Sequence, residues 1–196
     1  MTRDEAYQLL TEMMSNKNLI RHGVAVEAIM RGLCRELKAR EKETEGQSGE
    51  FDEEEWAIVG LLHDADYELV EKDPIRHTLV TEEKLRPLGV SDRVINGIKA
   101  HRDGIKESRD NFLEKGVYAA DDMSGLITAV ALVMPDKKLA SVSTESVLKK
   151  FKNKEFAKGA KREQILKGIE ELDLTLEEFT KIALKSMQGI SGELGL

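Results

Sequence analysis

The sequence is poor in cysteine, in proline and in long apolar runs. Its single cysteine, Cys34, excludes an internal disulfide, and the neighbouring Leu33 and Leu37 indicate a buried thiol. No apolar run approaches the roughly 20 residues of a membrane span, and the residues after Met1 lack the apolar core of a signal peptide. We therefore expect a cytoplasmic protein that has no membrane as a partner.

The charge balance is acidic. Lysine and arginine together number 30 and aspartate and glutamate 37, so the formal net charge is −7. Such a surface repels the phosphate backbone, and we expect no duplex nucleic acid as a partner. The length of 196 residues suffices for one domain with a sizeable core, or for one domain with a helical appendage.

Apolar residues recur at spacings of three and four along nearly the whole chain, and only three prolines interrupt them. Strict alternation of apolar and polar residues is scarce, so the pattern predicts an all-α fold. Residues 41–53 are polar and are predicted to form a loop. The expected helices cover about 2–15, 19–40, 56–62, 77–87, 92–101, 116–134, 161–172 and 176–188.

Local signals support several of these helix starts. Thr2 with Glu5, and Thr175 with Glu178, have the spacing of a capping box, and Ser91 is a typical N-cap residue. Lysine becomes frequent after residue 135, so we divide the chain into a helical domain at 1–140 and a C-terminal helical extension at 141–196 that packs on it. Whether the extension covers the bundle, shapes a pocket or forms a homodimer stays open.

The residues suited to metal binding are few and ordered. The chain has four histidines, and His63 is followed directly by Asp64. Asp64 and Asp121 lie on apolar helices, where an unpaired buried carboxylate costs several kcal/mol. A divalent cation would satisfy several such groups together, and imidazole nitrogen with carboxylate oxygen suits iron, manganese, zinc or a similar metal. We therefore expect at least one divalent metal ion.

This ordered set resembles the HD superfamily of metal-dependent phosphohydrolases over about residues 17–135. The signature of that family is a histidine, then a His-Asp pair, then a distant aspartate, each on a helix of one bundle. The corresponding residues here are His22, the pair His63 and Asp64, and Asp121. The resemblance implies an HD-domain helical bundle in which these four residues hold a metal, while Asp122 lies on the helix surface or behind the ligands.

Two further histidines, His77 and His101, fall between the His-Asp pair and the last aspartate. The resulting order H…HD…H…H…D is similar to two-metal members such as the HD-GYP phosphodiesterases and the YqeK-type diadenosine tetraphosphate hydrolases. The resemblance implies two ions with Asp64 bridging them; phosphate binding or helix capping is the alternative for His77 and His101. Tyr67 stands where many two-metal members have a lysine, and no GYP segment follows His101.

The expected catalytic residues are His63, Asp64 and Asp66, of which Asp66 either orients a ligand histidine or caps a turn. The expected substrate-binding residues are Tyr67, Arg76 and Arg102. Other basic residues that are candidates for holding phosphate are Arg21, Lys137, Lys138, Lys150, Lys152, Lys158 and Arg162.

The expected activity is hydrolysis of a phosphomonoester or phosphodiester, by resemblance that of a nucleotide, through attack of metal-bound hydroxide. The partner is then a small phosphorylated molecule. Two alternatives stay open: an HD regulatory module that binds metal and nucleotide without turnover, and a di-iron HD oxygenase.

Overall fold

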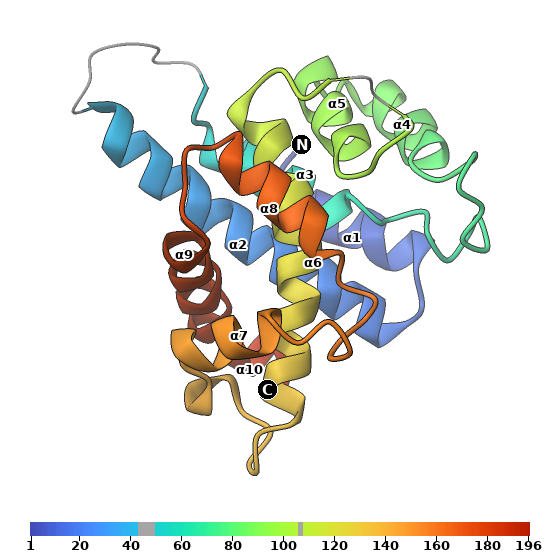
Figure 1. Cartoon of the computed structure of the whole chain (residues 1–196). Coiled ribbons are helices and arrows are strands. Elements are labelled where there is room, and N and C mark those ends of the chain that lie inside the picture. The colour runs from blue at the N-terminus through green and yellow to red at the C-terminus, as the bar shows by residue number, and fades with distance from the viewer. Residues whose placement is uncertain (43–49, 106–107) are drawn as a thin grey trace.

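The computed structural model describes residues 1–42, 50–105 and 108–196, which form helices and turns with no strand among them. The prediction of an all-α fold is confirmed, and Figure 1 shows the arrangement of the helices. Short 3-10 turns lie at Arg86–Leu88 and Leu139–Ser141. The α-helices are α1 (Arg3–Met13), α2 (Lys17–Lys42), α3 (Glu53–Leu62), α4 (Leu79–Leu85), α5 (Asp92–Ala100), α6 (Phe112–Leu132), α7 (Thr144–Phe151), α8 (Arg162–Glu170), α9 (Leu176–Gly189) and α10 (Ser191–Leu194).

The three predicted helix caps are confirmed. Thr2 and Glu5 form a reciprocal capping box at α1, and Thr175 and Glu178 form one at α9. The Ser91 side chain accepts a hydrogen bond from a backbone N–H in the first turn of α5. Each cap gives a partner to N–H groups that have none within their own helix.

Several predictions about the helices are wrong. His77 does not begin a helix but lies in a run of turns, and α4 starts only at Leu79. Thr78 adopts a left-handed φ of 73°, which a right-handed helix does not contain. The lysine-rich stretch after residue 135 holds the unexpected helix α7. Its buried face consists of Val147 and Phe151, and Lys149 and Lys150 separate these two residues in the sequence.

At the predicted loop 41–53, α2 continues to Lys42 and α3 begins at Glu53, so each helix includes one end of this range. Residues 43–49 lie outside the described part of the chain. In the second half, α6 begins at Phe112 rather than at 116, with the Asn111 side chain as its N-cap.

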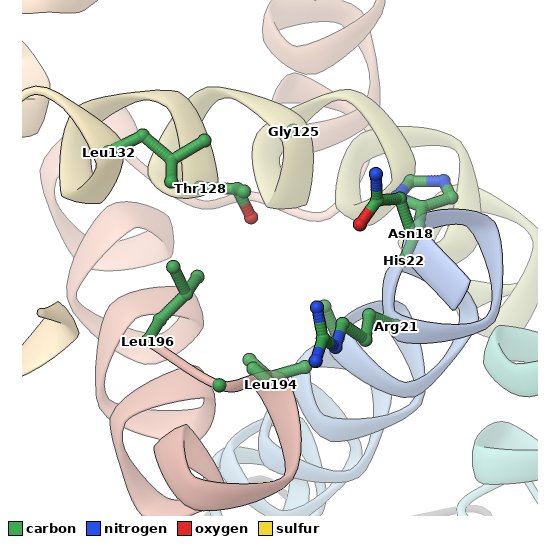
Figure 2. A pocket seen from close by; sticks show the side chains of 10 residues that line it. Asn18, Arg21, His22, Gly125, Thr128, Leu132, Leu194 and Leu196 are labelled. Atoms are coloured by element: carbon green, nitrogen blue, oxygen red, sulfur yellow. The ribbon is translucent and has the colours of Figure 1, made fainter. Parts of the chain in front are cut away.

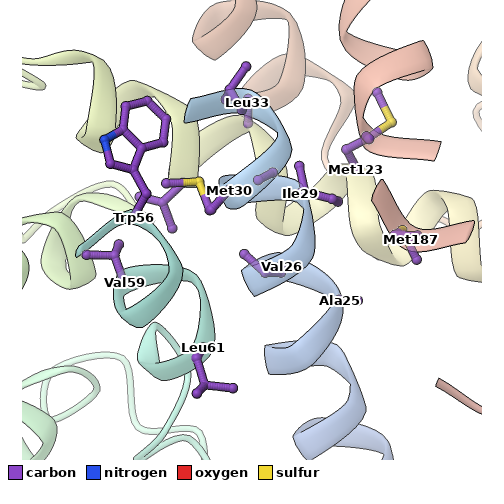
Figure 3. Packing of buried hydrophobic residues seen from close by; sticks show 14 of the residues in the cluster. Ala25, Val26, Ile29, Met30, Leu33, Trp56, Val59, Leu61, Met123 and Met187 are labelled. Carbon is purple, nitrogen blue, oxygen red and sulfur yellow. The ribbon is translucent and has the colours of Figure 1, made fainter. Parts of the chain in front are cut away.

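Helix α2 runs through the centre of the bundle and packs against α3, α6 and α9. Ile29 and Leu33 on α2 and Trp56 on α3 are fully buried, and Figure 3 shows the packing around them. Full burial of one such side chain stabilises the fold by roughly 1.5–3 kcal/mol. This core holds α2 and α3 side by side, which matters for the site because each helix carries a candidate metal ligand.

Two glycines allow α2 and α3 to approach closely. A Cβ atom added to Gly60 would lie 2.9 Å from backbone atoms of Val26 and Glu27 on α2. A Cβ added to Gly23 would lie 2.8 Å from the carbonyl oxygen of Leu61 on α3. These distances are shorter than a normal contact of 3.5–4.0 Å, so only glycine fits at this crossing.

The C-terminal helices pack on the same bundle: α8 lies against α6, and α9 lies against α2 (Figure 1). Apolar residues of α8 and α9, such as Ile165 and Phe179, belong to the same buried cluster as α2. Among the described residues, no helix is both long enough and apolar enough to cross a bilayer.

Candidate metal centre

The six residues predicted as metal ligands lie together in two groups of three. In each group the ligand atoms lie within 4.8 Å of one another. The first group is His22, His63 and Asp121, and the second is Asp64, His77 and His101. In the second group, Asp64 and His77 precede α4 in the chain, and His101 follows α5.

The spacing within the first group fits one metal ion. The Nε2 atom of His22 lies 3.1 Å from Nε2 of His63 and 3.1 Å from Oδ1 of Asp121. The third edge, from His63 Nε2 to Asp121 Oδ1, is 3.6 Å. Two ligand atoms bonded to one ion at about 2.1 Å, with an angle between 90° and 109°, lie about 3.0–3.4 Å apart.

The second group has nearly the same dimensions. The Nε2 atom of His77 lies 3.1 Å from Nε2 of His101 and 3.1 Å from Oδ1 of Asp64. His101 Nε2 lies 3.4 Å from that same oxygen. Two triangles of similar size, each with two imidazole nitrogens and one carboxylate oxygen, make sites of the same donor chemistry.

Asp64 connects the two groups. Its Oδ1 atom belongs to the second group, and its Oδ2 atom lies 3.8 Å from His22 Nε2 and 3.7 Å from His63 Nε2 of the first. One carboxylate therefore presents an oxygen to each group. This is the position expected of a bridging carboxylate.

All four histidine rings are held through the Nδ1 atom. The Nδ1–H groups of His63 and His101 donate to the carbonyls of Gly60 and Ile98, at 2.7 Å and 2.6 Å. Both histidines stand at the C-terminal ends of helices, α3 and α5, where carbonyl groups lack a partner within the helix. The bond to the carbonyl three residues earlier orients each ring.

The other two rings are held by side chains. His77 Nδ1 lies 2.7 Å from Oδ1 of Asp66, and His22 Nδ1 lies 3.0 Å from the Ser124 hydroxyl. That hydroxyl donates to the carbonyl of Asp121, so it accepts from His22. With Nδ1–H donating in every ring, the Nε2 lone pairs face one another in two pairs, His22 with His63 and His77 with His101. Each pair requires a cation or a proton between its nitrogens.

Asp66 is fully buried behind His77. Beside the His77 ring, it accepts hydrogen bonds from the backbone N–H groups of Thr78 at 3.0 Å and Thr81 at 2.9 Å. Burial alone would raise the pKa of the Asp66 carboxyl, but these hydrogen bonds outweigh it and hold the pKa below its usual value. Asp66 therefore orients His77 and also caps the turn, and it does not line the centre itself.

The centre attracts positive charge. Burial disfavours the charged form of His63, but the carboxylates of Asp64 and Asp121 outweigh it and raise the pKa of His63 to about 9. The pKa values of Asp64 and Asp121 lie well below their usual values, because the histidines offset the cost of burial. A bound divalent cation would take over this compensating role.

The neighbour Asp122 belongs to neither group of ligands, although it lines the same space as His22 and Asp121. Its Oδ1 atom accepts the backbone N–H of Lys161 at 2.9 Å, and burial followed by the charge of Asp121 raises its pKa to about 6. The bond ties α6 to the segment before α8. Part of that segment, from Ala157 to Ala160, covers a space of about 350 Å³ beside His22 and Asp121.

Tyr67 lies half-buried at the edge of the second group, with its ring centroid 5.4 Å from that of His77. Burial, followed by the charges of Asp64 and Asp121, raises the pKa of its hydroxyl. Arg76 is exposed and Arg102 is half-buried, each beside a ligand histidine in the chain. The role of these three residues in substrate binding stays a prediction.

Comparison with known families agrees with this geometry. The model of the HD domain family matches residues 19–126, more than half of the 196-residue chain. The chain belongs to the HD domain family. HD domains bind divalent metals and are generally metal-dependent hydrolases. No curated protein and no solved structure matches this HD domain protein, and its likeness to YqeK-type or HD-GYP-type members stays a prediction.

Sequence reasoning missed two parts of the site. Ser124, which holds His22, gave no signal because a lone serine on an apolar helix is common. Arg162 was a candidate for holding phosphate, but it is buried and donates to backbone carbonyls of residues 151–160. It therefore shapes the segment that covers the centre.

Proposed function

We propose that this HD domain protein is a phosphohydrolase that cleaves a phosphomonoester or phosphodiester of a nucleotide and requires divalent metal. The observation that carries the proposal is the pair of three-residue groups joined by the Asp64 carboxylate. Metal ions held 3.5–4 Å apart in such sites lower the pKa of water and neutralise charge on phosphoryl oxygens.

The side chains of this protein prepare that chemistry. The four oriented imidazole rings and the two carboxylates provide the ligand atoms without rearrangement, because the Nδ1 side of each ring already has a partner. The Tyr67 hydroxyl at the edge of the centre supplies a hydrogen-bond donor for a phosphate oxygen. Arg102 and Arg76 supply positive charge from the turns beside His101 and His77.

A nucleophilic side chain is not needed for this reaction. The Ser124 hydroxyl contacts a histidine ring, but it is fully buried behind that ring and donates to the Asp121 carbonyl. It is therefore a positioning residue for His22. This arrangement favours direct hydrolysis over a covalent phosphoenzyme.

The test is hydrolysis of phosphate esters, measured as release of inorganic phosphate from monoesters and of the ring-opened monophosphate from cyclic nucleotides. Protein purified without chelator is loaded in turn with Mn²⁺, Fe²⁺ and Zn²⁺ and is assayed with nucleoside mono- and diphosphates, cyclic nucleotides and phenyl phosphate. We expect release with at least one metal, and a loss of at least about a hundredfold in Asp64→Asn. Asp4→Asn, the same change at an exposed position of α1, is the matched control and keeps full activity.

Absence of hydrolysis of every monoester and diester with every metal would overturn the proposal. Oxygen consumption by the iron-loaded protein in the same preparation would then favour the di-iron oxygenase. Binding of nucleotide without turnover would favour the regulatory module.

A further inference from the structure

A second cavity adjoins the metal centre. Its volume is about 540 Å³, and it lies between the first turns of α2, the second half of α6 and the chain after α9 (Figure 2). His22 and Gly125 line both this cavity and the space over the metal ligands. The two spaces therefore meet at these two residues, next to the first group of ligands.

Helix periodicity explains why the cavity begins at the metal centre. Asp121, Gly125, Thr128 and Leu132 follow one another at spacings of four, three and four, so they lie on one face of α6. At a rise of 1.5 Å per residue, Leu132 lies about 16 Å beyond Asp121 along the helix. A molecule whose phosphate lies at the metal ligands can therefore extend along this face.

Gly125 leaves open the space between the metal ligands and the cavity. A Cβ atom added there would meet no other atom within 4 Å, so the residue faces free space. Its position one helical turn from Asp121 places this free space directly beside the ligand.

The chemistry of the walls changes along the cavity. Asn18 lies beside His22 at the end near the metal ligands, and Thr128 and Arg21 face the middle (Figure 2). The far end is apolar, and there Leu132, Leu194 and Leu196 face one another. A ligand that matches these walls is polar beside its phosphate and apolar at its other end.

Arg21 supplies a free hydrogen-bond donor. Its guanidinium lines the cavity, and no ion pair of Arg21 is found in the part of the chain that the structure describes. The end of the chain packs beside it: Gly195 has a φ of 71°, and a Cβ there would lie 3.2 Å from an Nη atom of Arg21. Glycine at 195 thus lets Leu194 and Leu196 close the cavity without displacing the arginine.

We propose that this cavity, the Leu132 pocket, binds the nucleoside part of a nucleotide substrate; the proposal rests on the proposed function. The ribose hydroxyls then meet Asn18 and Thr128, next to the phosphate. The base lies against the leucines, and Arg21 donates to a carbonyl oxygen or ring nitrogen of the base. A volume of about 540 Å³ lies within the range of small-molecule sites, roughly 300–1,000 Å³.

Two neighbouring residues provide a matched test. Leu132 and Val133 are 51% and 56% exposed, but only Leu132 lines the pocket. We expect Leu132→Asp to lower the ratio of kcat/KM for a nucleoside monophosphate to kcat/KM for methyl phosphate at least about tenfold. Val133→Asp leaves this ratio unchanged. An unchanged ratio in Leu132→Asp would overturn the proposal.

A binding measurement separates this proposal from the proposed function. Adenosine, guanosine, cytidine and uridine, which carry no phosphate, are titrated into the full chain by calorimetry. We expect at least one to bind, with affinity reduced at least about tenfold in Leu132→Asp and in Arg21→Gln. Such binding without hydrolysis of any phosphate ester would uphold the pocket and refute the hydrolase.

The opposite result is equally clear. Release of phosphate from nucleotides, combined with an affinity for nucleosides that is unchanged in both variants, would uphold the hydrolase and refute the pocket. Tighter binding of octyl phosphate than of any nucleotide, unaffected by Arg21→Gln, would also refute it, since the pocket would then hold an alkyl chain. Thermal unfolding of each variant checks that the fold is retained.

Discussion

The crossing of α2 and α3 at Gly60 predicts a selective loss of metal. In Gly60→Ala the new Cβ would lie 2.9 Å from the backbone of Val26 and Glu27, where a normal contact is at least about 3.5 Å. The helices must therefore separate by about 0.6 Å. His22 is carried by α2 and His63 by the end of α3, so their Nε2 atoms, now 3.1 Å apart, separate with them.

The expected energies follow from this displacement. Overpacking typically lowers the free energy of unfolding by about 1–3 kcal/mol, and the higher helix propensity of alanine raises it by up to about 1 kcal/mol. The net loss of unfolding free energy is therefore about 0–2 kcal/mol, and the fold survives. Metal sites tolerate changes in bond length of only about 0.2 Å, so the first group loses its ion while the second keeps it.

Elemental analysis and thermal unfolding of Gly60→Ala and Gly189→Ala test this reasoning. A Cβ at Gly189, at the end of α9, meets nothing within 4 Å, so that variant keeps its metal and its stability. We expect Gly60→Ala to lose roughly one ion per chain relative to this control. Equal metal content and equal Tm in the two variants would refute the role given to the glycine crossing.

Three further predictions concern single side chains. Burial raises the pKa of the Cys34 thiol to about 11, so iodoacetamide should label the folded protein negligibly at pH 8 and readily only in denaturant; fast labelling of the folded chain would contradict this. Thr175→Ala removes the capping box with Glu178 and should lower the unfolding free energy by about 0.5–2 kcal/mol in urea titration, while an unchanged midpoint would show that α9 does not need its cap. Ser124→Ala leaves His22 without its partner, so the affinity for metal should fall about 10–100-fold in competition with a chelator, and an unchanged affinity would remove Ser124 from the site.

The Glu178 carboxyl adds a dependence on pH to the α9 cap. Hydrogen bonds from Thr175, followed by Arg40, lower the folded pKa of Glu178 to about 2, below its unfolded value. A carboxyl with a depressed pKa stabilises the fold fully above the unfolded pKa, and the contribution is lost as pH falls toward the folded one. The difference in stability between the wild type and Thr175→Ala should therefore shrink from pH 6 to pH 3.

The helices and the order of the ligands were predictable because both depend on local spacing. The three- and four-residue repeat marks the buried face of α2, and the polar pairs at Thr2 and Thr175 mark helix starts. His63 and Asp64 end an apolar helix together, which is a pattern visible in the chain itself.

The remaining parts depend on segments that are far apart in the sequence. The hydrogen bond between Ser124 and His22 joins residues that are 102 positions apart, and the sequence around neither residue indicates it. The Leu132 pocket needs α2, α6 and the chain end together. The turn at Thr78 was not predicted because threonine rarely adopts a positive φ. Here the Asp66 carboxylate accepts hydrogen bonds from the backbone N–H groups of Thr78 and Thr81.

The most direct test of the central claim is the metal-to-protein ratio of the wild type and of His101→Ala, both purified without chelator. We predict a ratio of about two in the wild type and about one in the variant, because His101 belongs only to the second group. A wild-type ratio of one or less, or an equal ratio in both proteins, would contradict the two-metal centre.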